Sequence, residues 1–180
     1  TYNREDGHYY YTPRMTFEEF KNLSDNILFS TACLGGLLAS DDEELKQEFI
    51  KHMIANKDRC WLEVQHHQDK DQINYNQYLL NLSKQTGLKL IAGTDTHALD
   101  ERHAKGRIIL QKSKDVHFDN EDSWDITMKT CDELVELYRK QGIFTDEEIF
   151  EFLDNTNKLA DMVEEFELDR SHKYPKMSDN

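Results

Sequence analysis

The residues best suited to chemistry are an aspartate and a histidine two positions apart, Asp95 and His97, in the stretch 88–99. The apolar start of this stretch predicts a short buried strand, on which side chains two apart point the same way. A carboxylate and an imidazole would then lie side by side at the carboxyl end of a strand, where α/β proteins place their chemistry. Such a pair suits zinc or manganese. It equally suits an aspartate that caps the next turn and binds the histidine, because two ligands do not complete a metal site.

A cysteine occupies the equivalent place after another predicted strand. The apolar run 27–32 has the length of a strand and leads into Cys33 and a pair of glycines. The commoner fate of a free cysteine is a small buried apolar side chain. The alternative interpretation is a thiolate that binds a metal.

A third predicted strand, 60–67, carries Glu63 among apolar neighbours and ends in His66 and His67. A buried carboxylate is costly unless hydrogen bonds, an ion pair or a metal compensates it. Adjacent histidines on a strand point apart. We therefore expect at most one of them to face a shared site and at least one to be solvated.

Helical patterns separate these strands by short links. The order β-α-β-α-β predicts parallel strands joined by right-handed crossovers. A further helix from about residue 101 to 112 is expected to turn Ile108 and Ile109 inward. The helix that begins at Ser40 is expected to bury Ile54. The residues expected at helix ends are Ser40, Asp69, Gly87 and Asp100.

The pattern changes at Trp124. Residues 124–129 are compatible with a short strand, and Thr130 begins a helix that Gly142 ends. Thr145 with Glu148 predicts a capping box at the start of another helix. This helical tail lacks catalytic groupings.

The composition restricts the function. The 180 residues suffice for one domain or part of a larger one. With 32% charged residues and a net charge of −14, this piece should repel phosphate and not grip nucleic acid by itself. The three cysteines form no Cys-x-x-Cys motif, which favours a reducing, cytoplasmic setting. No apolar run approaches the roughly 20 residues of a membrane span.

If the three strands are neighbours, their ends bring together a thiol, carboxylates and imidazoles. A zinc or manganese ion held there would lower the pKa of bound water and produce a nucleophile near neutral pH. The implied reaction is metal-assisted hydrolysis, most plausibly of a phosphoester.

Three segments also carry a family resemblance: ACLGG (32–36), WLEVQHH (61–67) and GTDTHAL (93–99). Their order and spacing resemble the PHP (polymerase and histidinol phosphatase) domain of bacterial DNA polymerase III alpha subunits. The flanking stretches YYYTPRMTFEEF and DNTNKLADMVEEFELD are similar to the corresponding stretches of the same proteins, so that the resemblance covers nearly the whole chain.

The resemblance implies the C-terminal portion of a distorted, TIM-like, seven-stranded α/β barrel over residues 1–123. A helical linker toward the polymerase palm would follow over residues 124–180. It implies a metal cluster of zinc or manganese, with magnesium as a further alternative. Cys33, Asp95 and His97 would be metal ligands, and Glu63 and His67 would line the site. The parent would be a cytoplasmic DNA-directed DNA polymerase that contacts DNA and other replisome subunits outside this acidic piece.

One departure from the family matters. Its first motifs, including a His-x-His, are absent from this chain. We therefore expect only part of the ligand set, no catalytic residues, and a fragment that is inactive alone and binds metal weakly. The strand edges of a partial barrel would favour pairing with a second copy.

Three functions remain open at this stage. The barrel of a polymerase subunit would either proofread as a metal-dependent 3′–5′ exonuclease or only stabilise the polymerase through a vestigial site. The third alternative is part of a stand-alone PHP phosphoesterase. The helical tail favours the polymerase, because a small phosphatase needs no linker toward a palm.

Overall fold

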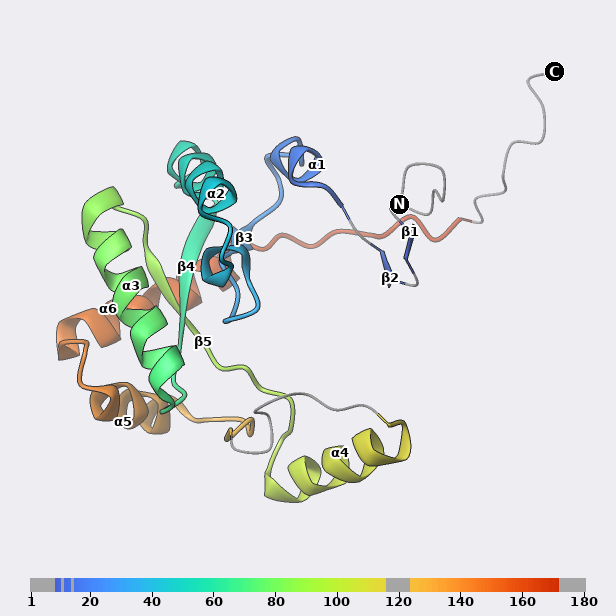
Figure 1. The fold of residues 1–180 in the computed structure, drawn as a ribbon, viewed down its shortest axis with the longest axis vertical. Helices are drawn as coiled ribbons and strands as arrows, with labels where there is room; N and C mark the ends of the chain where they lie inside the picture. The colour runs from blue at the N-terminus through green and yellow to red at the C-terminus, as the bar shows by residue number, and fades with distance from the viewer. Residues whose placement is uncertain (1–8, 11, 14, 116–123, 172–180) are drawn as a thin grey trace.

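A three-stranded parallel sheet lies at the centre of the fold (Figure 1). The structure, a computed structural model, describes residues 9–10, 12–13, 15–115 and 124–171. The sheet order is β3 (Phe29–Ser30), β4 (Cys60–Gln65), β5 (Leu90–Gly93). β4 is the middle strand and is buried along nearly all its length, as a strand covered on both faces should be. The predicted parallel α/β arrangement is confirmed, and the seven-stranded barrel stays a prediction.

Helices α2 (Glu43–Ala55) and α3 (Lys70–Thr86) make the two crossovers. The bounds of α3 follow from its caps: the Asp69 side chain accepts from the amide of Gln72, and Gly87 takes the left-handed conformation (φ 73°) that glycine tolerates. Both ends were predicted from sequence. Sequence suffices to predict both ends of α3, because a capping residue bonds to backbone groups only a few positions away.

The predicted start of α2 was wrong by two residues. The cap is Asp42, whose side chain accepts from the amide of Leu45 at 2.9 Å. Ser40 instead ends a short 3₁₀ turn, η1 (Leu37–Ala39), and its hydroxyl donates to the carbonyl oxygen of Leu37. Ile54, predicted to be buried, is 40% exposed.

The N-terminal elements are short. β1 (Tyr9–Tyr10) and β2 (Thr12–Pro13) pair antiparallel with each other. α1 (Phe17–Lys21) begins with a capping box between Thr16 and Glu19.

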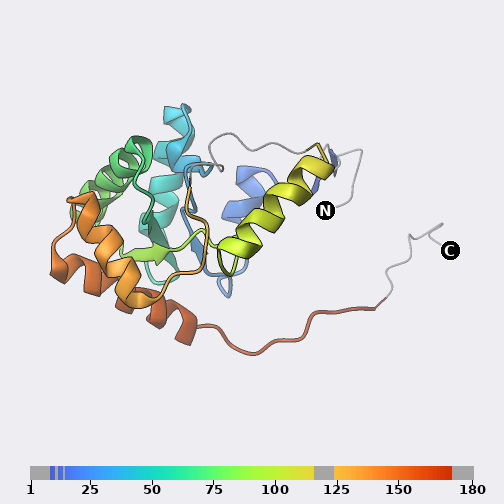
Figure 2. The ribbon, with the colours of Figure 1, turned by 90° about the horizontal axis from the view of Figure 1, so that it is seen from below.

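Helix α4 (Glu101–Ser113) begins at its predicted cap, Asp100, but buries none of its residues. Ile109, expected to face inward, is 70% exposed. Figures 1 and 2 show why: α4 extends away from the sheet, on the side remote from α3, α5 and α6. The polar sequence of residues 115–123 predicts a loop after this helix, and all of it apart from Asp115 lies outside the described residues.

Residues 124–129 do not form a strand. They contribute one isolated parallel bridge, between Ala98 and Thr127. The backbone amides of His97 and Ala98 both donate to the carbonyl oxygen of Ile126, which ties the segment after β5 to the segment before α5.

Helices α5 (Cys131–Gln141) and α6 (Asp146–Asp161) start with the capping boxes of Thr130 and Thr145. They pack on the sheet rather than stand apart from it. The buried side chains that they add to the core of β4 and β5 are Leu134, Val135, Tyr138, Ile149 and Phe152. The predicted domain boundary at residues 123 and 124 falls at the edge of a stretch that the structure does not describe.

Helix α6 also covers the outer edge of β5. The Asn155 side-chain amide donates to the carbonyl oxygen of Leu90 (3.0 Å), and the amide of Ala92 donates to the Thr156 hydroxyl (2.9 Å). These groups of β5 point away from β4, so two side chains of a helix replace two of the hydrogen bonds that a further strand would make. Among the described residues, no helix is long and apolar enough to cross a membrane.

Candidate functional site

Asp95 lies between two histidines at the carboxyl ends of β4 and β5. One carboxylate oxygen, Oδ2, is 3.2 Å from Nε2 of His67, and the other, Oδ1, is 3.1 Å from Nε2 of His97. An ionised carboxylate can only accept, so each imidazole donates from Nε2. The structure therefore confirms that Asp95 and His97 lie side by side, and it adds His67 to them.

The reason for this proximity differs from the predicted one. β5 ends at Gly93, and Asp95 adopts a left-handed backbone conformation (φ 45°). Aspartate tolerates this conformation better than most residues. Asp95 and His97 thus meet in the irregular segment after the strand, rather than through alternation along it.

The hydrogen bond from His67 holds the pKa of Asp95 below its usual value. Partial burial acts in the opposite direction, and His97 adds to the lowering. Asp95 therefore stays ionised and acts as an acceptor for both imidazoles at neutral pH.

The two adjacent histidines are both buried, contrary to the expectation that at least one is solvated. His66 is 2% and His67 is 4% exposed. They also do not point apart: because β4 ends at Gln65, the two rings lie 4.7 Å apart at an angle of 32°. The indole of Trp124 stacks on the imidazole of His67, with the ring centres 4.7 Å apart and an angle of 22° between the ring planes.

The imidazole of His66 is uncharged at neutral pH. Burial, together with the neighbouring His67, lowers the pKa of His66 to about 4. His66, His67 and Trp124 line a cavity of about 370 Å³.

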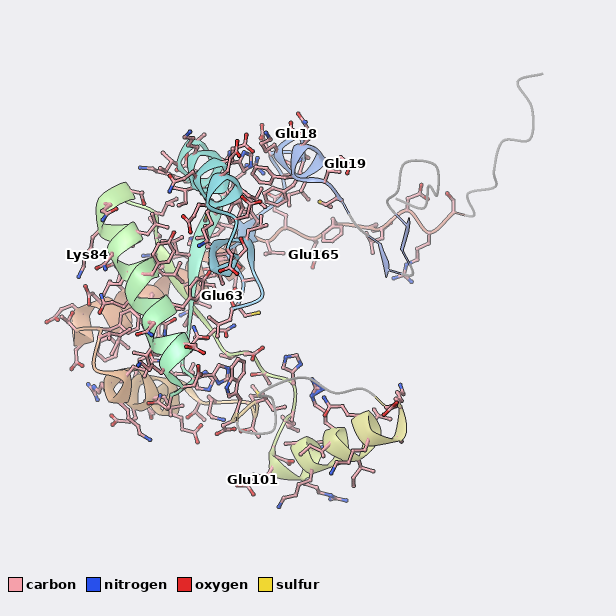
Figure 3. All side chains as sticks on the ribbon, in the orientation of Figure 1. Glu18, Glu19, Glu63, Lys84, Glu101 and Glu165 are labelled. Atoms are coloured by element: carbon pink, nitrogen blue, oxygen red, sulfur yellow. The ribbon has the colours of Figure 1, made fainter. Side chains whose placement is uncertain are left out.

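The carboxylate of Glu63 accepts hydrogen bonds, one of the three ways in which its burial was expected to be compensated. It stands on β4, the middle strand (Figure 3), where the Ser30 hydroxyl donates to Oε2 (2.7 Å) and the Gln65 amide to Oε1 (3.2 Å). A methyl group on Gly93 would lie 2.3 Å from Glu63 Oε1, so the carboxylate occupies space that only a glycine leaves free.

Cys33 follows the end of β3, as predicted. Ala32, with φ 57°, breaks the extended backbone just before it. The thiol is free and partly exposed. Within the described part of the chain, no hydrogen bond or ion pair connects Cys33 to Asp95, His67 or His97, and its role as a ligand stays a prediction.

The ligand types at Asp95 suit a metal, but their present geometry does not hold one. Two imidazole nitrogens and a carboxylate are ligands for zinc or manganese. Among the described residues, however, no group of three or more His, Cys, Asp or Glu side chains is arranged around a shared metal position. Each Nε2 donates to Asp95, so an ion would have to replace these two hydrogen bonds, with loss of the proton from each Nε2.

Sequence reasoning missed three contributors to this site: Trp124, Tyr138 and Gln141. Trp124 covers His67, whereas the hydroxyl of Tyr138 and the amide of Gln141 donate to backbone carbonyls at the strand ends. The only signal was that Tyr138 and Gln141 lie three residues apart, on one side of a helix.

The three-stranded parallel sheet with its crossover helices makes the chain an α/β protein, and ionisable side chains gather at the carboxyl edge of the sheet. No family model matches the chain. It is 26% identical to the DNA polymerase III subunit alpha of Borreliella burgdorferi over 89% of this chain and 14% of that protein. With the Aquifex aeolicus subunit, identity is 32% over 61% of this chain and 10% of the relative. A DNA-directed DNA polymerase of Bacillus phage SPbeta is 25% identical over 84% of the chain and 13% of its own length.

The predicted similarity to DNA polymerase III alpha subunits is thereby confirmed for most of the chain, whereas the PHP domain stays a prediction. It spans only about one seventh of the length of the Borreliella relative.

Proposed function

We propose that this chain is part of a replicative DNA polymerase alpha subunit, and that it contributes a PHP-type metal site to it. The observation that carries the proposal is the similarity of nearly the whole chain to proteins named DNA polymerase III subunit alpha. The parent would polymerise DNA with residues outside this chain. It would contact DNA and other replisome subunits there too, because this piece carries a net charge of −14.

His67, Asp95 and His97 are the residues that would hold the metal, with Cys33 as the further predicted ligand and Glu63 beside them. A bound zinc or manganese ion supplies an activated water for phosphoester hydrolysis, as in 3′–5′ proofreading. Before a metal binds, Asp95 orients both imidazoles through its two oxygens, and the indole of Trp124 stacks on the His67 ring.

A structural role is the second candidate. It is supported by the hydrogen bonds of Asp95, because both carboxylate oxygens already have histidine partners that tie the ends of β4 and β5 together. In that case the site is vestigial, and its residues contribute stability to the polymerase.

The test uses the full-length polymerase that contains this chain, as wild type and as Asp95→Asn. Metal content, removal of a mismatched 3′ nucleotide, and primer extension are measured on each. The control is Asp154→Asn, which removes an exposed carboxylate that pairs with Lys158 on α6. We expect Asp95→Asn to lose bound metal and mismatch removal but retain primer extension, and the control to retain all three.

The outcomes separate the candidates. A parent without primer extension would refute the polymerase assignment. A parent that extends primers but whose metal content and mismatch removal do not depend on Asp95 would refute the metal site and favour the structural role.

A further inference from the structure

The backbone that carries His67 is held by a buried side-chain amide from another element. Nε2 of Gln141, on α5, donates to the carbonyl oxygens of Gln65 (2.9 Å) and His67 (2.7 Å). It thereby bridges the last residue of β4 and the histidine that binds Asp95.

Two further buried amides fix the orientation of Gln141. Nδ2 of Asn76 donates to Oε1 of Gln141 (3.0 Å) and to the carbonyl oxygen of Gln65 (2.7 Å). Nε2 of Gln72 in turn donates to Oδ1 of Asn76 (2.8 Å). All three amides are buried, and buried amides are retained in such a network only when their partners are well placed. Because Asn76 donates to Oε1 of Gln141, the other end of that side-chain amide, Nε2, faces the carbonyl oxygens of Gln65 and His67.

A second side chain on the same side of α5 contacts both strand ends. The Tyr138 hydroxyl lies 2.9 Å from the carbonyl oxygen of Val64 and 3.3 Å from that of Gly93. Gly93 is two residues before Asp95. Helix α5 thus contacts the strand that leads to His67 and the strand that leads to Asp95.

We propose that Gln141 is a positioning residue for the pair of His67 and Asp95. Its removal leaves the carbonyl oxygen of Gln65 with a partner, since Asn76 still donates to it, but takes from the carbonyl oxygen of His67 its bond to α5. The change therefore falls on His67, and the ring loses its fixed place between Trp124 and Asp95. The contacts of Gln141 with His67 and of His67 with Asp95 do not require a bound metal. Only the use of His67 and Asp95 in catalysis rests on the proposed function.

The test compares Gln141→Met with the unmodified 180-residue chain by NMR of the aromatic rings, without added metal. Methionine keeps the length of the side chain and removes both amide donors. We expect the ring signals of His67 and His97 to shift, because both share Asp95. We also expect loss of the Overhauser contact between the rings of His67 and Trp124. The signals of His67 are assigned with His67→Gln.

The control is Gln77→Met on α3, whose amide bonds to Asn81 on its own helix. It should leave the rings of His67 and Trp124 in contact. The inference is overturned if Gln141→Met retains that contact with unshifted histidine signals, or if the control has the same effect.

A second variant guards against general unfolding. Gln141→Asn keeps the amide but shortens the side chain, so it should also lose the bond to His67 while it disturbs the core less. If both variants unfold the chain, Gln141 is a general core residue and the inference fails. Since the readout needs no metal, a negative result here leaves the proposed metal site standing, and failure of the metal site leaves this result unaffected.

Discussion

Replacing Gly93 with alanine tests how closely the end of β5 is packed against Glu63. The new methyl carbon would lie 2.3 Å from Oε1 and 2.8 Å from Cγ and Cδ of Glu63. Contacts this short have to be relieved. The glutamate is the movable partner, and its movement breaks the hydrogen bonds from Ser30 and Gln65.

The expected cost follows from these contacts. Overpacking of a closely packed interior costs about 1–3 kcal/mol, and each hydrogen bond to a charged group contributes about 1.5–3 kcal/mol. Alanine also restricts the unfolded chain, which offsets about 0.4–1 kcal/mol. We expect Gly93→Ala to lower the free energy of unfolding by about 2 kcal/mol, since Glu63 is partly exposed and recovers some hydration.

Urea unfolding followed by circular dichroism measures this difference. The matched control is Gly106→Ala in α4, where a methyl group meets nothing within 4 Å. A glycine inside a helix is less stable than alanine by about 0.5–1 kcal/mol, so the control should be stabilised.

A double-mutant cycle identifies the cause. In a Glu63→Ala background the methyl group of Gly93→Ala has no carboxylate to displace, and its cost should largely vanish. If Gly93→Ala costs nothing, or costs as much with alanine at position 63 as with glutamate, the proposed packing of Glu63 on Gly93 is wrong.

Three further changes have defined outcomes, each measured by urea unfolding. Burial lowers the pKa of His52 below its usual 6.5, so the unfolded chain takes up a proton more readily. The free energy of unfolding should therefore fall as the pH drops below about 6.5, and His52→Gln should flatten this dependence. Asp42→Ala should cost about 1 kcal/mol and Ser40→Ala less, because Asp42 caps α2; the reverse order would contradict the cap. Tyr138→Phe should cost about 1–2 kcal/mol, because its hydroxyl contacts two strand carbonyls, and an unchanged midpoint would contradict that contact.

Local signals predicted the helix ends well, and their one failure is informative. Asp69, Gly87, Asp100 and Thr130 act on amides or carbonyls within a few residues, so sequence suffices to place them. Ser40, the predicted cap of α2, was wrong. The structure uses Asp42, two residues later, because the chain first completes a 3₁₀ turn.

Burial of whole faces was harder to predict. The apolar residues of α4 suggested an inward side, but Ile109 is exposed since the helix leaves the sheet. Which element lies opposite a helix is decided by contacts distant in sequence, and periodicity carries no information about them.

The candidate site shows the same division. The spacing of Asp95 and His97 predicted their contact, whereas the contact of Asp95 with His67 joins residues 28 positions apart. The stacking of Trp124 on His67 and the bond from Gln141 are longer in range still. All three join segments far apart in sequence, and the bond from Gln141 also depends on how α5 packs against the sheet, which the sequence pattern did not specify.

The cover that α6 provides on β5 limits how copies of this sheet can associate. Asn155 and Thr156 already bond two outward backbone groups of β5, and α6 covers that edge. In the described part of the chain, β3 is the other outer strand of the sheet, and no strand pairs on its far side. A sheet with one covered edge accepts a single additional strand, for example from a second copy. It cannot grow edge to edge into an open-ended fibre, which requires two available edges on every molecule.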